Sequence, residues 1–373
     1  MINKLKKLGP GLLFAGAAIG VSHLVQSTRA GADFGFSLLW VLILSNIIKY
    51  PFFLFGPKYA MATGETLLHG YKKMNTNVLV TYFILSIVTM FTIQTAVTIV
   101  TAGLAIELFG ISSNITTWAI IITILCLFIL IIGRYKFLDN LMKFVIILLT
   151  ISTIFAVFFA GFGSTNSFEI KQVFPTTEIG IAFLAAFMGW MPAPLDISVW
   201  QSVWTVANNR KTKKKANLKE TLFDFKIGFF GTLTLAIMFL SLGAFVLFNQ
   251  GEELSNSAVG FSKQLISVYT NSLGSWSFYI ISIAALTTMF STAITCLDAF
   301  PRVLRPTFKM LFTKYDNKRF NKKIYTSILI ATSAGSFLVI MFFMKNILKS
   351  RLSGRLHIVG QPYKFFICIY HYN

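Results

Sequence analysis

One segment near the middle of the chain restricts the fold more than any other. Residues 189–196 (GWMPAPLD) lie inside an apolar run, from about Ile179 to Trp204, that is long enough to cross a membrane. Pro192 and Pro194 each lack an N–H and clash with the carbonyl one turn back, so we expect an interrupted helix. The freed backbone groups need partners in hydrocarbon, and Asp196 places a carboxylate within a turn of them. Such an interrupted membrane helix is typical of solute sites in secondary transporters.

The composition of the whole chain agrees with a membrane protein that crosses the bilayer many times. Of the 373 residues, 55% are hydrophobic and only 12% are charged, with a mean hydropathy of +0.71. The net charge of +20 does not indicate nucleic-acid binding, because the basic residues fall in short loops between apolar runs. The three cysteines show no disulfide or metal-ligand spacing. The chain also lacks His-Glu-x-x-His and Gly-x-Ser-x-Gly motifs, so we expect no enzyme activity and no resident cofactor.

Apolar runs predict nine membrane spans in an all-α fold, with a tenth needed to complete two halves of five. The nine lie at about 10–30, 36–57, 77–109, 115–133, 137–163, 179–204, 224–249, 274–299 and 324–345. Basic residues concentrate in alternate loops, including Arg210–Lys215, whereas the loop from Gln250 to Leu265 carries Glu252 and Glu253. This bias places the N-terminus in the cytoplasm and predicts an integral protein of a bacterial cytoplasmic (inner) membrane, surrounded by lipid.

The first span shows a second interruption at the matching place. Gly16, Gly20 and the polar pair Ser22-His23 lie at membrane depth, five spans before the Pro-x-Pro segment. Two halves with an odd number of spans have opposite topology, which predicts an inverted repeat with two broken helices facing one solute. We expect residues 16–23 and 189–194 to be non-helical and in contact near the bilayer midplane.

The expected organisation is a single transmembrane transporter domain over residues 1–373. The first repeat covers about 10–163 and the second about 179–345. Residues 346–373 are atypical, because Lys349, Arg351, Arg355 and Lys364 fall on the side expected to be external. This pattern predicts a truncated or frame-shifted tail.

Several stretches resemble the Nramp divalent-metal transporters. These are Gly9-Pro10-Gly11-Leu12-Leu13, Ala30-Gly31-Ala32, Gly35-Phe36-Ser37-Leu38-Leu39-Trp40-Val41, Leu44-Ser45-Asn46, Thr63-Gly64-Glu65 with Leu67, and Met191-Pro192. The match is dense over roughly the first 70 residues and around the sixth span. The resemblance implies a LeuT-type fold, with helices 1 and 6 broken, and proton-linked uptake of Mn²⁺- or Fe²⁺-like ions.

The chain departs from the family at the metal site that the resemblance implies. The family's Asp-Pro-Gly-Asn motif falls on residues 20–23 (GVSH), so Gly20 replaces the metal-binding Asp and His23 replaces the Asn. Ala193 replaces the His of Met-Pro-His, and Met191 alone keeps its identity. Thioether and imidazole favour softer or borderline metals over Mn²⁺. The expected substrate-binding residues are Gly20, Ser22, His23, Met191, Ala193 and Asp196, with His23, Met191 and Asp196 as metal ligands.

Each candidate ligand also has a structural alternative. His23 is either a functional group or a histidine hydrogen-bonded between helices, and Met191 is either a ligand or a packing residue. Asp196 either serves the solute or caps the second half-helix. For Asp298, at the end of the eighth span, we expect an ion pair with a neighbouring arginine.

Three functions remain open from the sequence. The first is a secondary transporter moving a cation, a divalent metal, with proton coupling. The second is the same fold carrying a small organic solute. The loss of the Asp and the exposed half-helix N-terminus near Ala193 would suit an anionic group on such a solute. The third is a degenerate member that transports nothing.

Overall fold

The computed structural model describes residues 10–112, 114–132, 135–163, 171–212, 217–248, 254–255, 257–312 and 318–352. Every regular element in these ranges is a helix. In chain order they are α2 (Pro10–Ala18), the π-helix η1 (Val21–Ser27), α3 (Thr28–Phe34), α4 (Leu39–Thr63), α5 (Leu67–Met74), α6 (Thr76–Phe109), α7 (Ile115–Ile132), α8 (Tyr135–Gly163), α9 (Glu178–Trp190), α10 (Asp196–Thr212), α11 (Leu218–Val246), α12 (Ala258–Leu273), α13 (Ser277–Phe312) and α14 (Lys318–Leu352). Most of the tail expected to be atypical lies outside the described residues, as do the basic N-terminal lysines.

Six helices of the described ranges are long and apolar enough to cross a membrane, compared with the nine spans expected. They are α4, α6, α7, α11, α13 and the segment Asn321–Phe342 of α14. The first expected span is divided into α2, η1 and α3, and the sixth into α9 and α10. The helix α8 is 29 residues long, but its side chains are described only from Ile147 onward, so it counts here as the shorter apolar stretch Ile147–Phe162. The difference from nine therefore arises where the helices are divided or where side chains of the helix are not described.

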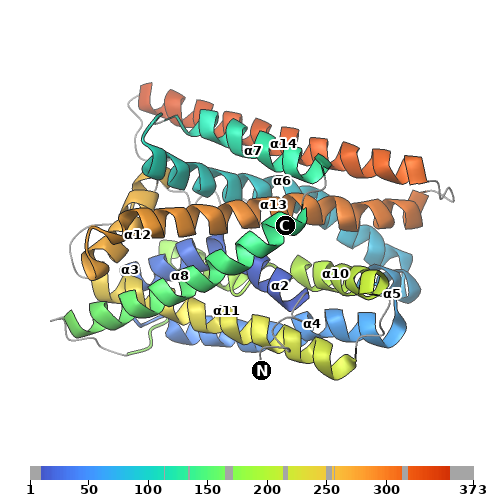
Figure 1. The fold of residues 1–373 in the computed structure, drawn as a ribbon, viewed down its shortest axis with the longest axis horizontal. Coiled ribbons are helices and arrows are strands. Elements are labelled where there is room, and N and C mark those ends of the chain that lie inside the picture. Colours follow the sequence, from blue (N-terminus) through green and yellow to red (C-terminus); the bar gives the residue numbers. More distant parts are fainter. Residues whose placement is uncertain are drawn as a thin grey trace.

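Most segments of the divided helices lie in the interior of the bundle. Figure 1 shows α2 and α10 between one layer that contains α6 and α13 and another that contains α4 and α11. The helices α7 and α14 lie beyond α6 and α13 on the outer side. Consistent with this arrangement, α13 contacts α6, α14, α8 and α2, and α11 contacts α2, α3 and α4. The long helices thus form a frame around α2, η1 and α10, whereas α9 contacts α4 and η1.

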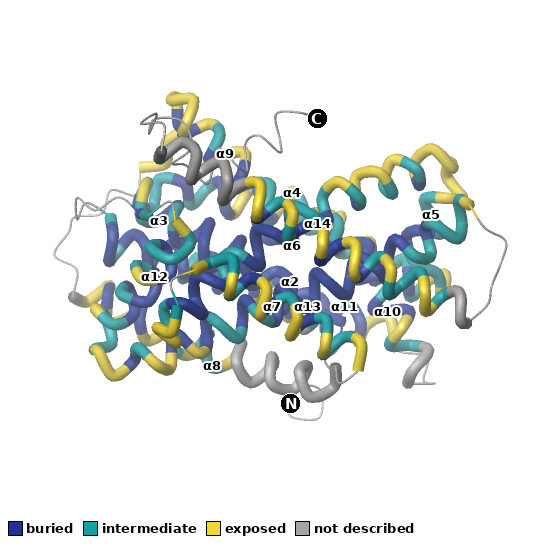
Figure 2. The backbone as a smooth tube through the Cα atoms, turned by 90° about the horizontal axis from the view of Figure 1, so that it is seen from above, coloured by how far each residue is buried: buried dark blue, intermediate teal, exposed yellow. Residues whose placement is uncertain are grey.

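The outer surface of the bundle is apolar. Ile47, Phe52 and Phe55 on α4 are exposed, as are Phe128 on α7 and Phe158 on α8. Figure 2 shows the buried residues at the centre of the bundle and exposed residues along its periphery. Large exposed apolar faces on parallel helices indicate contact with lipid. The interior instead contains many buried hydroxyl and amide side chains.

Glycines allow α3 and α11 to approach at backbone distance. A Cβ added at Gly31 would lie 1.9 Å from the carbonyl oxygen of Leu240, and one at Gly243 would lie 2.2 Å from that of Thr28. Small residues at such crossings let membrane helices pack closely. This contact gives a structural reason for the Ala30-Gly31-Ala32 stretch noted in the sequence.

The two interruptions are shorter than the sequence suggested. Ile19 and Gly20 separate α2 from η1, and residues 191–195 separate α9 from α10. Gly16 and Gly189, expected to be non-helical, lie in α2 and α9. Proline alone does not interrupt a helix in this fold, because α4 continues through Pro51 and Pro57. Two prolines within three residues leave too few N–H groups for the helix to continue.

Candidate functional site

The backbone carbonyls freed at the first interruption accept hydrogen bonds from side chains. The amide of Ile19 donates to Ala15 O (2.7 Å), and the amide of Gly20 donates to Ala18 O (2.9 Å). The Thr292 hydroxyl of α13 lies 3.2 Å from Gly16 O and 3.3 Å from Ile19 O. The Ser22 hydroxyl donates to Ala18 O as well. The protein therefore satisfies this helix end from its own residues, as a helix end in hydrocarbon requires.

The backbone carbonyls at the second interruption accept hydrogen bonds from a lysine side chain. The Lys49 ammonium of α4 donates to Met188 O (2.7 Å), Gly189 O (2.7 Å) and Ala193 O (3.2 Å). An ammonium group has three N–H donors, and here each has a carbonyl acceptor. The positive charge lies at the C-terminal end of α9, where the helix dipole is negative. One side chain thus joins the end of α9 to the residue between the two prolines.

The three expected metal ligands contact three different neighbours. His23 is fully buried, with Nδ1 2.8 Å from Ala18 O and Nε2 3.0 Å from Thr232 O on α11. The Met191 sulfur, also fully buried, accepts a hydrogen bond from Ser27 Oγ of η1 (3.7 Å). Asp196, the first residue of α10, accepts a long hydrogen bond from Thr89 Oγ1 of α6 (3.5 Å). His23 must release at least one carbonyl before it can bind a metal.

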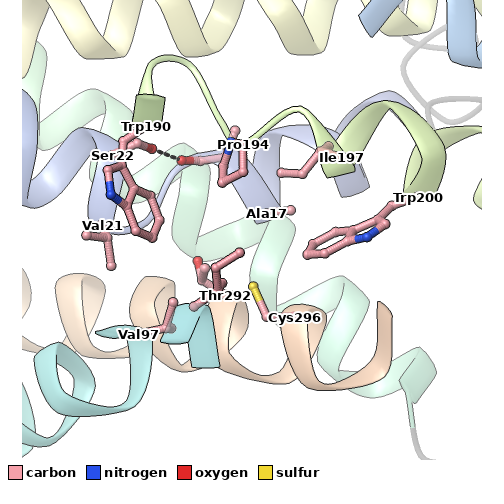
Figure 3. A pocket seen from close by; sticks show the side chains of 12 residues that line it. Ala17, Val21, Ser22, Val97, Trp190, Pro194, Ile197, Trp200, Thr292 and Cys296 are labelled. Atoms are coloured by element: carbon pink, nitrogen blue, oxygen red, sulfur yellow. Dashed lines mark hydrogen bonds between the residues drawn. The ribbon is translucent and has the colours of Figure 1, made fainter. Parts of the chain in front are cut away.

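A small cavity lies between the two interruptions. It is lined by Ala17, Ala18, Val21, Ser22, Ile93, Val97, Trp190, Pro194, Ile197, Trp200, Thr292 and Cys296. Figure 3 shows Trp190, Pro194 and Trp200 facing Thr292, Cys296 and Val97 across it. Its volume of about 20 Å³ is comparable to one water molecule, so a larger solute needs an opening movement. The polar groups of its lining side chains are the hydroxyls of Ser22 and Thr292, the Cys296 thiol and the indole N–H groups of Trp190 and Trp200.

The cavity wall and the expected substrate-binding residues differ. Of the six expected residues, Ser22 lines the cavity, whereas Gly20, His23, Met191, Ala193 and Asp196 do not. Gly20 faces the Thr292 side chain. Met191 and Ala193, which flank Pro192, are both fully buried, and the Met191–Pro192 peptide bond is cis. Within the part of the chain that the structure describes, no group of three or more His, Cys, Asp and Glu side chains is placed to hold a metal ion. The lining side chains therefore offer a metal ion two hydroxyl groups and a thiol, and no carboxylate or imidazole.

Two important residues were missed from the sequence. Lys49 is the single charged residue in the first two-thirds of its span, and an ionisable residue at membrane depth is a recognised signal of function. Thr292 carried no such signal, because an isolated threonine in an apolar helix is ordinary. Its contact with Gly16 and Ile19 joins residues more than 270 positions apart and appears only in the fold.

The expected ion pair of Asp298 is confirmed. Arg302 Nε donates to Asp298 Oδ2 (2.5 Å), one turn along α13. The Tyr325 hydroxyl of α14 donates to the other carboxylate oxygen, Oδ1 (2.5 Å). Because Asp298 is buried and satisfied by these two donors, its role is to join α13 to α14.

Comparison with known proteins identifies the family. Residues 11–366 match the family described as Nramp, natural resistance-associated macrophage protein-like. The uncharacterized protein PM0681 of Pasteurella multocida (strain Pm70) is 33% identical over 348 residues, which cover 92% of this chain and 79% of that protein. The divalent metal cation transporter MntH of Yersinia pestis (strain Pestoides F) is 36% identical over 64 residues, 17% of this chain and 16% of that protein.

Solved structures share the fold at low sequence identity. A manganese transporter of Eremococcus coleocola, in complex with an aromatic bis-isothiourea compound, superposes with a TM-score of 0.62 at 13% identity, covering 93% of this chain and 72% of that chain. Mhp1, a nucleobase-cation-symport-1 family transporter with bound bromovinylhydantoin, gives 0.58 at 12% identity, covering 97% and 74%. A Na⁺-coupled sialic acid symporter gives 0.60 at 15% identity, covering 91% and 74%. The fold is thus shared with these three solved proteins, and because the family match extends over nearly all of the sequence, this chain belongs to the Nramp family.

Proposed function

We propose that this chain is a secondary transporter that moves a divalent metal cation across the cytoplasmic membrane, with protons as the coupling ion. Its membership of a family that includes divalent metal cation transporters is the observation that carries the proposal. The solute passes between the two interruptions, where the cavity lies. In this family setting the chain is a transporter and not an enzyme.

The donor atoms around the cavity favour softer ions than Mn²⁺. Ser22, beside His23 on η1, lines the cavity together with Cys296 of α13. The Met191 thioether is held against η1 by Ser27. Imidazole, thioether and thiol suit Zn²⁺ and similar ions, whereas Mn²⁺ prefers carboxylate oxygen. Because Gly20 and Ala193 bring no ligating side chain, we expect Zn²⁺ or Co²⁺ to bind more tightly than Mn²⁺.

The test is an uptake panel in proteoliposomes. Mn²⁺, Fe²⁺, Co²⁺, Zn²⁺ and Cd²⁺ are compared with small organic solutes, with and without an inwardly directed proton gradient. We expect uptake of the softer metals and acceleration by the gradient. Metal-dependent protection from thermal unfolding in detergent gives a second readout that needs no transport. Absence of both metal uptake and metal protection would refute the metal proposal.

A small organic solute is the second candidate, and the cavity wall favours it. Two indole rings, Trp190 and Trp200, and the side chains of Val21, Val97 and Ile197 surround the cavity. Apolar and aromatic walls with a few hydroxyl groups are typical of sites for organic ligands. Replacing Trp200 by Ala separates the two candidates, because it should impair transport of an organic solute much more than metal-dependent thermal protection.

The orientation in the membrane is part of the proposal. The positive-inside bias places the start of α11 in the cytoplasm and α12 on the outer side. Lys219, at the start of α11, and Lys263, in α12, are both exposed and provide a matched pair of Lys→Cys variants. A membrane-impermeant thiol reagent applied outside should label Lys263→Cys and not Lys219→Cys. The reverse pattern would overturn the orientation.

A further inference from the structure

The Lys49 ammonium has a ligand set that resembles the coordination of a bound ion. Its three acceptors are the main-chain oxygens of Met188, Gly189 and Ala193, at 2.7, 2.7 and 3.2 Å. A neutral amine has only two N–H groups, so three carbonyl acceptors match the charged form. The acceptors that the described residues give this lysine are all carbonyls, whereas Lys73 pairs with the Glu65 carboxylate. The charge of Lys49 is therefore balanced by neutral carbonyl dipoles.

We propose that these three carbonyl oxygens form a cation site at the α9–α10 interruption, and that the Lys49 ammonium is its resident, covalently tethered cation. Backbone carbonyls that converge on one point replace the hydration shell of a monovalent cation. They also carry the negative end of the α9 dipole, which attracts positive charge. A lysine supplied by α4 fills this site without any ion from solution.

The tether explains how the second interruption keeps its shape. Met188 and Gly189 belong to the last turn of α9, whereas Ala193 lies beyond Pro192 in the non-helical segment. An ammonium bound to all three fixes the path of the chain around the prolines. The neighbouring residues Trp190 and Pro194 form part of the cavity wall, so the same contact positions that wall. Lys49 is accordingly a positioning residue, and this role holds whichever solute is transported.

The site makes a specific prediction about chemical rescue. Removing the side chain in Lys49→Ala leaves three carbonyls without donors and opens a channel about as wide as the lost alkyl chain. Ethylammonium and propylammonium carry the same three N–H donors on a short chain and should occupy this channel. Tetramethylammonium carries the same charge but has no N–H, so it should not replace the lysine.

The experiment measures folded yield and thermal unfolding of purified full-length protein in detergent. Lys49→Ala is solubilised and heated in matched concentrations of sodium, ammonium, ethylammonium, propylammonium or tetramethylammonium chloride. We expect a lower yield and a midpoint several degrees below that of the unmodified chain, with recovery of both in ethylammonium or propylammonium. Lys58→Ala is the matched control, because Lys58 lies on the same helix and is exposed. It should show neither the loss nor the recovery.

Two further results keep the proposal falsifiable. Lys49→Met fills the channel with an apolar chain, so it should be destabilised and insensitive to ethylammonium. Equal yields of Lys49→Ala in ethylammonium and tetramethylammonium, including no yield in either, would overturn the proposal. Full stability of Lys49→Ala in sodium chloride would overturn it as well. None of these measurements depends on metal transport, so they stand apart from the test of the proposed function.

Discussion

Thr292 of α13 lies so close to Gly20 that the two positions cannot both carry ordinary side chains. A Cβ on Gly20 would lie 2.8 Å from Thr292 Cγ2 and 2.9 Å from its Oγ1. The same hydroxyl lies within hydrogen-bonding distance of Gly16 O and Ile19 O. Thr292 therefore holds the end of α2 in the way that Lys49 holds the end of α9. Each interruption is completed by a side chain from another helix.

The first prediction follows from this contact. Gly20→Ala should lower the free energy of unfolding by about 1–3 kcal/mol, because the added methyl group displaces Thr292 from a packed position. Gly231→Ala is the matched control, since a methyl group added at Gly231 of α11 would meet no neighbouring atom within 4 Å. That change should stabilise the helix slightly, by up to about 1 kcal/mol. Chemical or thermal unfolding in detergent measures both.

The combination Gly20→Ala with Thr292→Ala decides whether the contact is the cause. Removing Cγ2 and Oγ1 leaves Thr292 Cβ as the nearest atom, at 3.2 Å. The double variant should then lose less stability than the sum of the two single variants. Strict additivity would show that Gly20→Ala acts through something other than Thr292.

The sequence predicted the positions of the helices well, because membrane spans depend on local composition. The apolar runs anticipated each long helix, and the paired prolines anticipated the non-helical residues 191–195. Two short helices, α5 and α12, were not anticipated. They carry mixed polar and apolar residues, for which hydropathy gives no signal.

The candidate site was predicted less completely, since it depends on contacts between distant segments. The resemblance predicted Gly20, His23, Met191 and Ala193 as substrate-binding positions, but it did not show what their side chains contact. His23 contacts Thr232 of α11, and Asp196 contacts Thr89 of α6. The sequence does not specify which helices pack together, so these two contacts could not be predicted from it. Lys49 was detectable as a charge in an apolar span, whereas its three carbonyl partners were not.

The second prediction concerns the junction of α13 and α14. Tyr325→Phe removes one of two donors to the buried Asp298 carboxylate and should lower the free energy of unfolding by about 1–3 kcal/mol. Tyr279→Phe is the control, because Tyr279 is 66% exposed and keeps its ring contact with Phe278. An equal effect of the two changes in thermal unfolding would show that the Tyr325 hydroxyl contributes nothing specific.

The third prediction is a dependence on pH at the loop that joins α4 and α5. The Lys73 ammonium, hydrogen-bonded to Glu65 at 2.5 Å, lowers the pKa of the Glu65 carboxyl. A carboxyl whose pKa is lowered by folding contributes stability above its unfolded pKa of about 4.3 and loses it as the pH falls through the folded value. Glu65→Gln should therefore reduce the unfolding midpoint slightly at pH 7 and leave it unchanged well below pH 4.

Salt and the partner residue provide the check on this exposed pair. Because both side chains reach solvent, high salt should shrink the difference between Glu65→Gln and the unmodified chain. Lys73→Met should show the same pH window, and the double variant should lose no more than either single one. A difference that persists at acid pH would assign the effect to packing instead of charge.

The last prediction asks whether the missing carboxylate sets the metal preference. Gly20→Asp restores an anionic oxygen at the first interruption, but its side chain requires space that Thr292 occupies. The variant is therefore combined with Thr292→Ala, and Thr292→Ala alone is the control. Because Mn²⁺ prefers carboxylate oxygen, the combined variant should bind Mn²⁺ at least tenfold more tightly than that control, measured by calorimetry in detergent. His23→Ala, in the unmodified background, should abolish binding of Zn²⁺ if the imidazole is a ligand. If neither change alters the affinity for any metal, while an organic solute is still transported, then the solute is organic and the two indole rings of the cavity wall become its expected contacts.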